Sequence, residues 1–383
     1  MRPLSILLFY DCIYPESVGG VEHRNYELAR ALGERGHRVT LAGFADAPSQ
    51  PSAGVEILPV GPRKRLYTEA GKRSTLEAAR LAAAASRIDL RPFDVIETAN
   101  IPYVHLPVLA ARCHLLGKPF VVTWYEYWGR YWRQYLGAKW PLYAAVERLT
   151  VPLGTRALAD SHLTASRVET RRHEEVLVIP VGIPAARIRE AAQSGEKEAG
   201  PPLVYAGRLL REKRVDLLLE AVARLAPRWP GPLLAVIGDG PDRERLMDLA
   251  ERLGLQAAVT FLGHLPTNAD VWRTIGASRI AVQPSSREGF GLFPLEAMAA
   301  GLPVIYCESS ESALSELVEP GVHGACTQPQ PDALAIALER LLADPGEVRR
   351  LAGNARRHAA RYDWSAVATD MENVFLSLLT ADS

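Results

Sequence analysis

The sequence predicts an α/β protein made of two doubly wound domains, and three observations support this. Short apolar segments typical of buried strands alternate with amphipathic segments typical of helices over residues 5–179, and the alternation restarts at residue 203. A polar segment rich in Gly and Pro, residues 191–202, separates the two series as a linker would. The chain of 383 residues is also too long for one ordinary hydrophobic core.

Each element is assigned from its apolar pattern. In the first half we expect strands at 5–10, 38–42, 95–98, 120–124 and 176–179, and helices at 21–35, 74–88 and 104–116. In the second half we expect strands at 203–206, 233–237, 259–262, 280–283 and 303–306, helices at 216–226, 242–253 and 295–300, and a tail helix at 364–379. The predicted domains are 1–185, a linker 186–202, 203–362 and a C-terminal helix in 363–383. Two such domains imply a cleft between them, where small molecules preferentially bind.

Composition excludes several classes of protein. No run of about 18 apolar residues occurs, and the apolar stretch after Arg2 is too short for a signal peptide. The four cysteines lie far apart, which suggests neither a zinc site nor a disulfide framework and favours a reducing, cytoplasmic location. Residues 1–190 carry 25 basic and 19 acidic side chains, and residues 191–383 carry 19 and 25. A basic half can face an acidic acceptor or an anionic membrane, or simply attract the other half, but nucleic acid would need a denser stripe.

The organising stretch is residues 284–301, a strand–loop–helix turn. Gly289 and Gly291 let a ligand approach the backbone closely, and the following helix N-terminus offers unpaired N–H groups. Glu288 lies at the mouth of the loop and Glu296 about one turn into the helix. Ionised carboxylates only accept hydrogen bonds, so this pair suits vicinal hydroxyls on two sugar rings. The loop therefore points to a carbohydrate ligand.

Other glycine-containing turns follow predicted strands. Arg208 and Lys213, after strand 203–206, can hold a diphosphate, although an isolated pair of this kind is usually a solvated loop. Gly19 and Gly20 precede the first helix, where a plain tight turn explains them as well as a ligand does. The turn 238–242 is interpreted as mainly structural.

An aromatic run, residues 124–136, begins at the end of a strand, where doubly wound sheets place ligands. Three interpretations stay open: an acceptor pocket for sugar rings, a surface segment that contacts a membrane, and an inter-domain core.

In these motifs the chain resembles the family-4 glycosyltransferases. The resemblance covers nearly the whole chain and rests on the E-x7-E segment 288–305, on Tyr205-Ala206-Gly207-Arg208 with Lys213, and more weakly on Gly19-Gly20, 236–241 and 261–263. It implies the GT-B fold, with two Rossmann-like domains and a final helix that crosses back to the first. It also implies retaining transfer of a hexosyl unit from a nucleoside diphosphate sugar, with UDP or GDP the expected carriers, no cofactor and no metal.

The resemblance also implies residue roles. Glu288 with the backbone of Gly289, Phe290, Gly291 and Leu292 would hold the donor sugar, and Glu296 the ribose hydroxyls. Arg208 and Lys213 would neutralise the diphosphate with help from Gly19 and Gly20, and the backbone from Gly263 to Leu265 would meet the base.

On the acceptor side the chain departs from the family. Tyr125 stands where members often carry a histidine, and Glu97 follows Asp94-Val95-Ile96 where another histidine is common. We expect Tyr125, Glu126 and Trp128 to contact the acceptor, with Glu126 orienting or deprotonating its hydroxyl. The acceptor, whether small molecule, lipid-linked or polysaccharide, and any peripheral contact with the inner membrane face stay open.

Three other functions are alternatives to sugar transfer. A GT-B nucleotide-sugar epimerase is the main alternative. An NAD-dependent oxidoreductase lacks its G-x-G-x-x-G turn at residues 14–20. A catalytically dead binding protein is disfavoured by the presence of all four donor-side charged residues.

Overall fold

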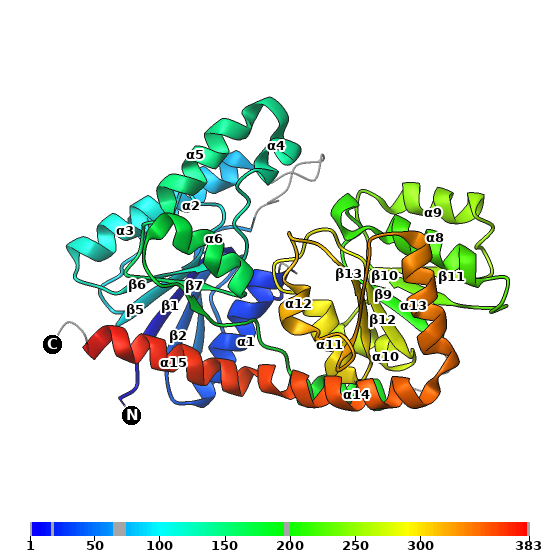
Figure 1. The fold of residues 1–383 in the computed structure, drawn as a ribbon. Helices are drawn as coiled ribbons and strands as arrows, with labels where there is room; N and C mark the ends of the chain where they lie inside the picture. Colours follow the sequence, from blue (N-terminus) through cyan, green and yellow to red (C-terminus); the bar gives the residue numbers. More distant parts are fainter. Residues whose placement is uncertain (1, 17–18, 64–73, 195–199, 381–383) are drawn as a thin grey trace. The chain divides into compact units, whose positions relative to one another are not determined.

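The computed structural model describes residues 2–16, 19–63, 74–194 and 200–380. The chain divides into two compact units, Met1–Gly182 with Trp364–Ser383 and Ile183–Asp363. Each unit has its own sheet with helices on both faces (Figure 1). The predicted α/β class with two doubly wound domains is confirmed.

The sheet of the first unit has the strand order β3-β4-β2-β1-β5-β6-β7-β8. Neighbouring strands pair in parallel except β3, which pairs antiparallel to β4. The strands are β1 (Ser5–Cys12), β2 (Arg38–Phe44), β3 (Ser49–Ser52), β4 (Val55–Gly61), β5 (Val95–Ala99), β6 (Phe120–Trp124), β7 (Arg156–Ala159) and β8 (Leu177–Val178). The order reverses between β1 and β5, so this is the switch point at which doubly wound sheets bind ligands.

Two hydrophobic cores cover the faces of this sheet. The strands are almost continuously apolar, as expected for parallel strands buried on both sides. The helices of this unit are α1 (Gly20–Glu34), α2 (Thr75–Arg87), α3 (Leu106–Leu115), α4 (Tyr131–Leu136), η1 (Gly137–Lys139), α5 (Trp140–Thr150), α6 (His162–Arg172) and α15 (Trp364–Thr380). One face packs against α2, α3 and α6, and the other against α1 and α15.

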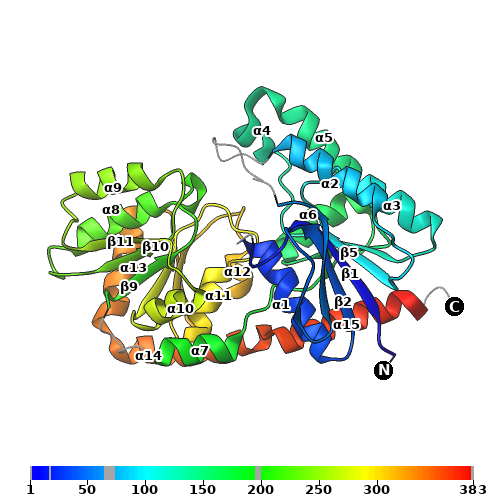
Figure 2. The same ribbon diagram turned by 180° about the vertical axis from the view of Figure 1, so that it is seen from behind.

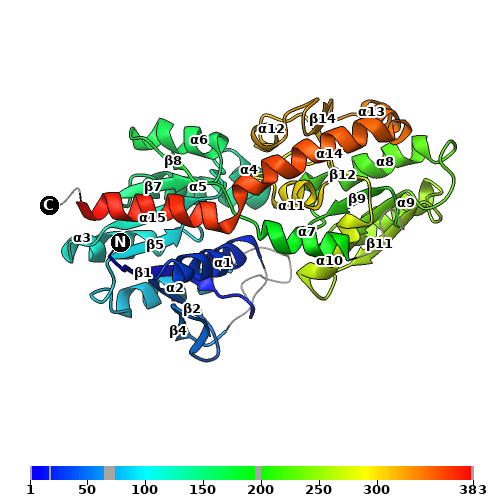
Figure 3. The same ribbon diagram turned by 90° about the horizontal axis from the view of Figure 1, so that it is seen from below.

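The C-terminal helix α15 belongs to the first unit and lies beside α1 (Figure 3). Its first residue, Trp364, packs so closely on Gly182 that a Cβ there would lie 2.6 Å from the indole ring. Farther along, the Glu372 carboxylate is 2% exposed and accepts hydrogen bonds from Arg35 Nε and His37 Nε2, each at 2.9 Å. Apolar packing and a buried charge pair therefore fix the returning helix.

The second unit has a six-stranded, wholly parallel sheet with the order β11-β10-β9-β12-β13-β14. Its strands are β9 (Leu203–Ala206), β10 (Leu234–Ile237), β11 (Val259–Gly263), β12 (Ile280–Gln283), β13 (Val304–Cys307) and β14 (Gly324–Thr327). Here the order reverses between β9 and β12. The loops that follow these two strands hold the predicted donor residues Arg208, Lys213 and Glu288, and Glu296 lies on the helix after the second of them.

Helices again cover both faces of the second sheet (Figure 2). They are α7 (Ala185–Gln193), η2 (Arg211–Lys213), α8 (Val215–Leu225), α9 (Arg243–Arg252), α10 (Asn268–Gly276), α11 (Leu292–Ala300), α12 (Leu314–Leu317), α13 (Pro331–Ala343), α14 (Pro345–Ala359) and η3 (Ala360–Tyr362). One core joins α8, α9 and α13 to the sheet, and the other joins α7, α10 and α11.

The prediction of a linker at residues 186–202 was wrong for the first part of this range. Residues 186–193 lie in α7, whose Ile188 and Ala192 are buried in the second core. A Cβ on Gly276 of α10 would meet the Ala192 carbonyl oxygen at 2.4 Å, so the two helices pack in close contact. Composition marked the segment as polar, but its two apolar positions one helical turn apart were enough to bury it. Residues 195–199 lie outside the described part of the chain.

Several elements were not predicted. In the first unit, strands β3, β4 and β7 and helices α4, α5 and α6 lie in stretches that were left unassigned. In the second unit the same is true of β14 and of helices α10, α12, α13 and α14. β7 is only four residues long and has too few residues to display a period of its own. Among the described residues, none of the helices combines the length and hydropathy needed to cross a bilayer.

Candidate active site

The loop after β12 carries Glu288 and ends at α11. Gly291, the residue before the helix, has φ +106°, in the left-handed region that glycine adopts without strain. A Cβ at this position would lie 2.6 Å from Leu314 Cδ2. Only glycine therefore fits this turn, which sets the direction in which the loop 284–291 leaves the sheet.

Glu288 is held by two donors from neighbouring segments. Lys213 Nζ donates to Glu288 Oε2 at 2.8 Å and to Oε1 at 3.0 Å. Gln283 Nε2, at the end of β12, donates to Glu288 Oε2 at 2.8 Å. The side chains of Lys213 and Glu288 are 20% and 14% exposed, so the pair is largely shielded but reachable from solvent.

The loop after β9 is fastened to the loop after β12. Ser286 donates from its backbone N–H at 2.8 Å and from its hydroxyl at 3.1 Å to the carbonyl oxygen of Glu212. Lys213 is the next residue, so these bonds fix the position from which its side chain reaches Glu288. The structure thus brings together two residues that lie 75 positions apart in the sequence.

Glycines hold the Arg208 segment against β10. Gly238 has φ +118°, and a Cβ there would lie 2.1 Å from the Gly207 carbonyl oxygen. A Cβ on Gly240 would lie 2.3 Å from the Leu209 carbonyl oxygen. The structural interpretation of this turn is supported by these contacts, which press it against the backbone on both sides of Arg208. The Arg208 side chain itself is exposed at the carboxyl end of β9.

Glu296 lies in the first half of α11 and faces α10. Trp272 Nε1 donates to Glu296 Oε1 at 2.9 Å. Loss of solvation raises the pKa of Glu296 to about 7, against the smaller opposing effect of the Trp272 hydrogen bond. Near neutral pH this carboxyl group is therefore poised between its charged and neutral forms.

Two other segments were predicted to contact the donor, one in each unit. Gly263 ends β11 with φ +67° and accepts a backbone hydrogen bond from Gly238, and Leu265 packs on the second core. In the first unit, Gly20 opens α1 with no atom near the place a Cβ would occupy, whereas a Cβ on Gly19 would lie 2.6 Å from Glu22 Oε1. The backbone at the start of α1 is thus open at Gly20 but crowded at Gly19.

The predicted acceptor residues separate into two environments. The Tyr125 hydroxyl is buried and, among the described residues, has no hydrogen-bond partner. Burial raises its pKa, so the group stays a neutral phenol. Trp128 instead belongs to an aromatic cluster, with its ring 4.5 Å from that of Trp132. Its backbone N–H donates to the buried Glu147 carboxylate at 2.8 Å.

Glu126 lies between these two residues, half-buried. Its backbone carbonyl accepts a hydrogen bond from Asn100 Nδ2 at 3.2 Å, which joins the loops after β5 and β6. Asp160, at the end of β7, is 4% exposed. Burial, and then the charge of Glu126, raise the pKa of Asp160 well above its ordinary value. The raised pKa shifts Asp160 toward its protonated form.

The sequence analysis did not predict a buried charge pair, which Arg24 and Glu97 form. Arg24 of α1 donates to Glu97 of β5 at 2.7 Å, and the two side chains are 4% and 2% exposed. Thr123 Oγ1 donates to the same Glu97 oxygen at 2.6 Å. Burial acts most strongly and lowers the pKa of Arg24, but the charge of Glu97, its hydrogen bond and the other acidic groups nearby together raise the pKa above its ordinary value. The available signal was a glutamate inside an otherwise buried strand, which predicts a buried cation.

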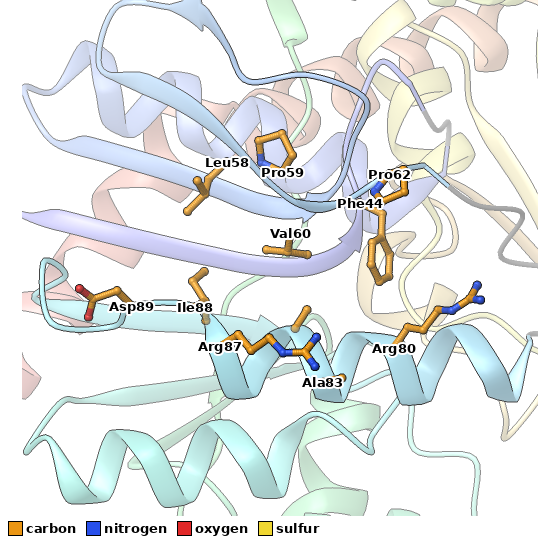
Figure 4. Close-up of a pocket in the computed structure, with 11 residues that line it drawn as sticks. Phe44, Leu58, Pro59, Val60, Pro62, Arg80, Ala83, Arg87, Ile88 and Asp89 are labelled. Atoms are coloured by element: carbon orange, nitrogen blue, oxygen red, sulfur yellow. The ribbon is translucent and has the colours of Figure 1, made fainter.

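The first unit also has an open groove of about 660 Å³ between α2 and the strands β2 and β4. Phe44, Val60 and Ile88 line it, and the side chains of Arg80 and Arg87 lie along α2 at its edge (Figure 4). Its lining is mainly apolar, unlike the polar ends of β9 and β12.

Comparison with known proteins agrees with the geometry of both units. The profile of "Glycosyl transferases group 1" matches residues 186–358, and that of "Glycosyltransferase Family 4" matches residues 18–187. A glycogen synthase of Mycobacterium tuberculosis is 37% identical over 206 residues, which are 53% of this chain and 49% of that protein. The match thus spans about half the length of each protein.

Solved structures extend the likeness to the whole fold. Sucrose-phosphate synthase from Thermosynechococcus elongatus aligns with a TM-score of 0.82 at 22% identity, covering 99% of this chain and 100% of that one. Anabaena Alr3699/HepE in complex with UDP-glucose aligns with a TM-score of 0.75 at 21% identity, covering 98% and 100%. At this identity the likeness establishes the fold. Two adjoining family profiles over nearly the whole chain, on a GT-B fold, identify this protein as a member of the family-4 glycosyltransferases, also described as glycosyl transferases group 1.

Proposed function

We propose that this chain is a retaining, metal-independent hexosyltransferase that moves a sugar from a nucleoside diphosphate to an acceptor hydroxyl. The observation that carries the proposal is the pairing of Lys213 with Glu288 at the β9/β12 switch point. One loop offers a cation for a diphosphate, and the other offers a carboxylate for sugar hydroxyls. A nucleotide sugar is a ligand that carries both groups next to each other.

The pair also suggests how the site changes when the donor binds. Without donor, Lys213 neutralises Glu288. A diphosphate would draw the ammonium toward its own oxygens and leave Glu288 free to accept hydrogen bonds from sugar hydroxyls. Arg208 adds a guanidinium at the end of β9. Positive charge here stabilises the leaving diphosphate as the bond to the anomeric carbon breaks. These two cations are proposed to do this without a metal.

Glu296 is proposed to accept the ribose hydroxyls, with the backbone at 263–265 beside the base. We propose that the base of the donor is uracil or guanine. Accepting two hydroxyl protons requires the ionised carboxylate, so donor binding should lower the pKa of Glu296 from about 7. The nucleoside end of the donor therefore contributes a pH dependence of its own.

On the acceptor side, Glu126 is proposed to orient or deprotonate the attacking hydroxyl. The bond that forms joins the acceptor oxygen to the anomeric carbon, the bond that breaks releases the nucleoside diphosphate, and the acceptor proton leaves through Glu126. The pKa of Asp160 is raised by burial and then by the charge of Glu126, which shifts this group toward the protonated form, in which it can donate a hydrogen bond.

Two measurements test the proposal. A thermal-shift panel of nucleoside diphosphates and their sugars should show stabilisation by one base series, because a ligand that binds only the folded state stabilises it. Incubation of that donor with sugar, lipid-linked and polyol acceptors should then yield a glycoside with the donor's anomeric configuration, determined by NMR. Conversion of the donor to an epimer with no acceptor present would support the epimerase alternative instead. No stabilisation by any nucleoside diphosphate would refute the donor site.

A further inference from the structure

An exposed apolar stripe runs along α5, on the outside of the first unit. Leu142 and Leu149 are 68% and 73% exposed, and Ala145 lies between them. Positions three and four apart share one face of a helix, so these three side chains form one continuous surface. Single exposed leucines are common in soluble proteins, but an aligned pair with no polar residue between them needs an explanation.

The charges around this stripe are of one sign. The exposed charged side chains of residues 127–153 are Arg130, Arg133, Lys139 and Arg148. The one acidic residue in this range, Glu147, is 0% exposed and is held by the backbone N–H groups of Trp128 and Gly129. The surface formed by α4, η1 and α5 is therefore basic and apolar.

Aromatic side chains form a half-buried layer beneath this surface. The ring of Trp128 lies 5.1 Å from that of Tyr131 and 4.9 Å from that of Tyr135, and Trp132 lies 5.3 Å from Tyr143. These rings meet edge to face or at a tilt, and the contacts of each ring with its neighbours make the surface rigid. Helices α4 and α5 contact each other and lie at the edge of the first unit in Figures 1 and 2.

From this arrangement we infer that the α4–η1–α5 surface binds an anionic lipid bilayer. Leucines on one helical face enter the region between headgroups and acyl chains, while arginines and lysine bind lipid phosphates. The absence of exposed acidic side chains between residues 127 and 153 favours a negatively charged partner. A bilayer suits this surface because the apolar stripe extends along one helix and the exposed charged side chains around it are all basic.

The role of this surface goes beyond sugar transfer itself. Membrane contact through α5 would hold the first unit, and with it the loop after β6, near acceptors at the bilayer. None of the residues on the stripe is proposed to contact the donor or the reacting hydroxyl. Binding to vesicles can therefore be measured independently of turnover.

The test is flotation of the full-length protein with vesicles of phosphatidylcholine, with and without phosphatidylglycerol. The wild type should float with the anionic vesicles and much less with the neutral ones, and added salt should weaken binding. Leu142→Ser/Leu149→Ser should lower binding to anionic vesicles roughly tenfold or more, since two apolar side chains lose their insertion. Arg133→Gln/Lys139→Gln/Arg148→Gln should remove the preference for anionic lipid. Ile336→Ser, which changes an isoleucine 67% exposed on α13 of the second unit, is the matched control and should bind like the wild type.

Three outcomes would overturn the inference. The first is wild-type protein that floats with neither kind of vesicle. The second is a leucine double variant that binds as well as the wild type while keeping its melting temperature. The third is a dimer, seen by analytical ultracentrifugation without vesicles, that the leucine variant abolishes, which would make the stripe a contact between copies. Failure of the donor-binding panel would leave all of these results unaffected, so the two proposals fail separately.

Discussion

The ammonium group of Lys213 lies 2.8 Å and 3.0 Å from the two carboxylate oxygens of Glu288. This contact joins the loops after β9 and β12, and the hydrogen bonds from Ser286 to the Glu212 carbonyl reinforce it. A cation and an anion, each poised to exchange its partner for part of a donor, form the centre of the proposed site. The first prediction therefore concerns this pair.

Lys213→Ala should lower turnover by roughly 10²–10³-fold, because it removes a charged donor aimed at the leaving diphosphate. The loss should appear mainly in kcat, since the interaction strengthens as negative charge develops. Arg211→Ala is the control, because Arg211 is two residues away and its side chain is 78% exposed. The turnover of this variant should stay close to that of the wild type. Equal turnover in the Lys213 variant and the wild type would rule out the assigned role.

Glu296 should make the stability of the ligand-free protein depend on pH. Its folded-state pKa of about 7 lies above the ordinary glutamate value of 4.5, so the folded state binds more protons than the unfolded state between these values. The free energy of unfolding should therefore fall as pH rises through this interval, by up to about 3 kcal/mol, and then level off. Glu296→Gln should lack this slope in denaturant titrations.

The same group should control donor affinity in the opposite direction. Calorimetric affinity for the nucleoside diphosphate should increase as pH rises through about 7, because the ionised form accepts the ribose hydroxyls. Trp272→Phe removes the hydrogen bond that lowers this pKa, so the midpoint should move to higher pH. If the midpoint of this pH dependence is unchanged in Trp272→Phe, and the pH dependence persists in Glu296→Gln, then another group is responsible for it.

Tyr125→Phe should leave stability unchanged or raise it by about 1 kcal/mol. The hydroxyl is buried without a described partner, and removing such a group removes its desolvation cost. If the hydroxyl contacts the acceptor, the variant should also lose transfer to that acceptor while its donor-induced thermal shift stays the same. A variant destabilised by several kcal/mol would mean that the hydroxyl has a structural partner.

Arg24→Met should destabilise the first unit by roughly 3–5 kcal/mol, since it leaves the Glu97 carboxylate buried without its cation. Arg24→Met/Glu97→Gln should recover most of this loss, because the amide carries no charge and can still accept from Thr123. Arg2→Ala, which breaks a pair whose arginine is 79% exposed, should cost less than about 1 kcal/mol in the same denaturant titration. A cost for Arg24→Met no larger than that of Arg2→Ala would contradict the buried-pair interpretation.

Gly238→Ala should weaken both folding and donor binding. The new Cβ would lie 2.1 Å from the Gly207 carbonyl and would displace the backbone that carries Arg208. Gly254→Ala is a matched control, since Gly254 also has positive φ, +68°, but has open space around it. It should cost only the conformational penalty of about 1–2 kcal/mol, with the donor-induced thermal shift unchanged. Equal effects of the two variants would mean that the steric contact is unimportant.

The sequence by itself determined the α/β class and placed the predicted donor residues at the ends of strands. Strand–loop–helix turns are local, so the glycines and charged residues of 203–213 and 280–301 could be placed at the ends of strands before their neighbours were known. Parallel strands then bring their carboxyl ends to one edge, which is why Lys213 and Glu288 could be assigned to one site from patterns 75 residues apart.

Only the tertiary structure decided the rest. Arg24 of α1 meets Glu97 of β5, and burial and then the charge of Glu126 raise the pKa of Asp160 at the ends of the paired strands β6 and β7. No local pattern records which of these side chains meet. The environments of the aromatic run were likewise settled only by folding: within the described part of the chain the Tyr125 hydroxyl has no hydrogen-bond partner, whereas Trp128 lies in a cluster of aromatic rings. Charge and ring contacts depend on distances between segments remote in sequence, whereas turns and helix faces depend on neighbours along the chain.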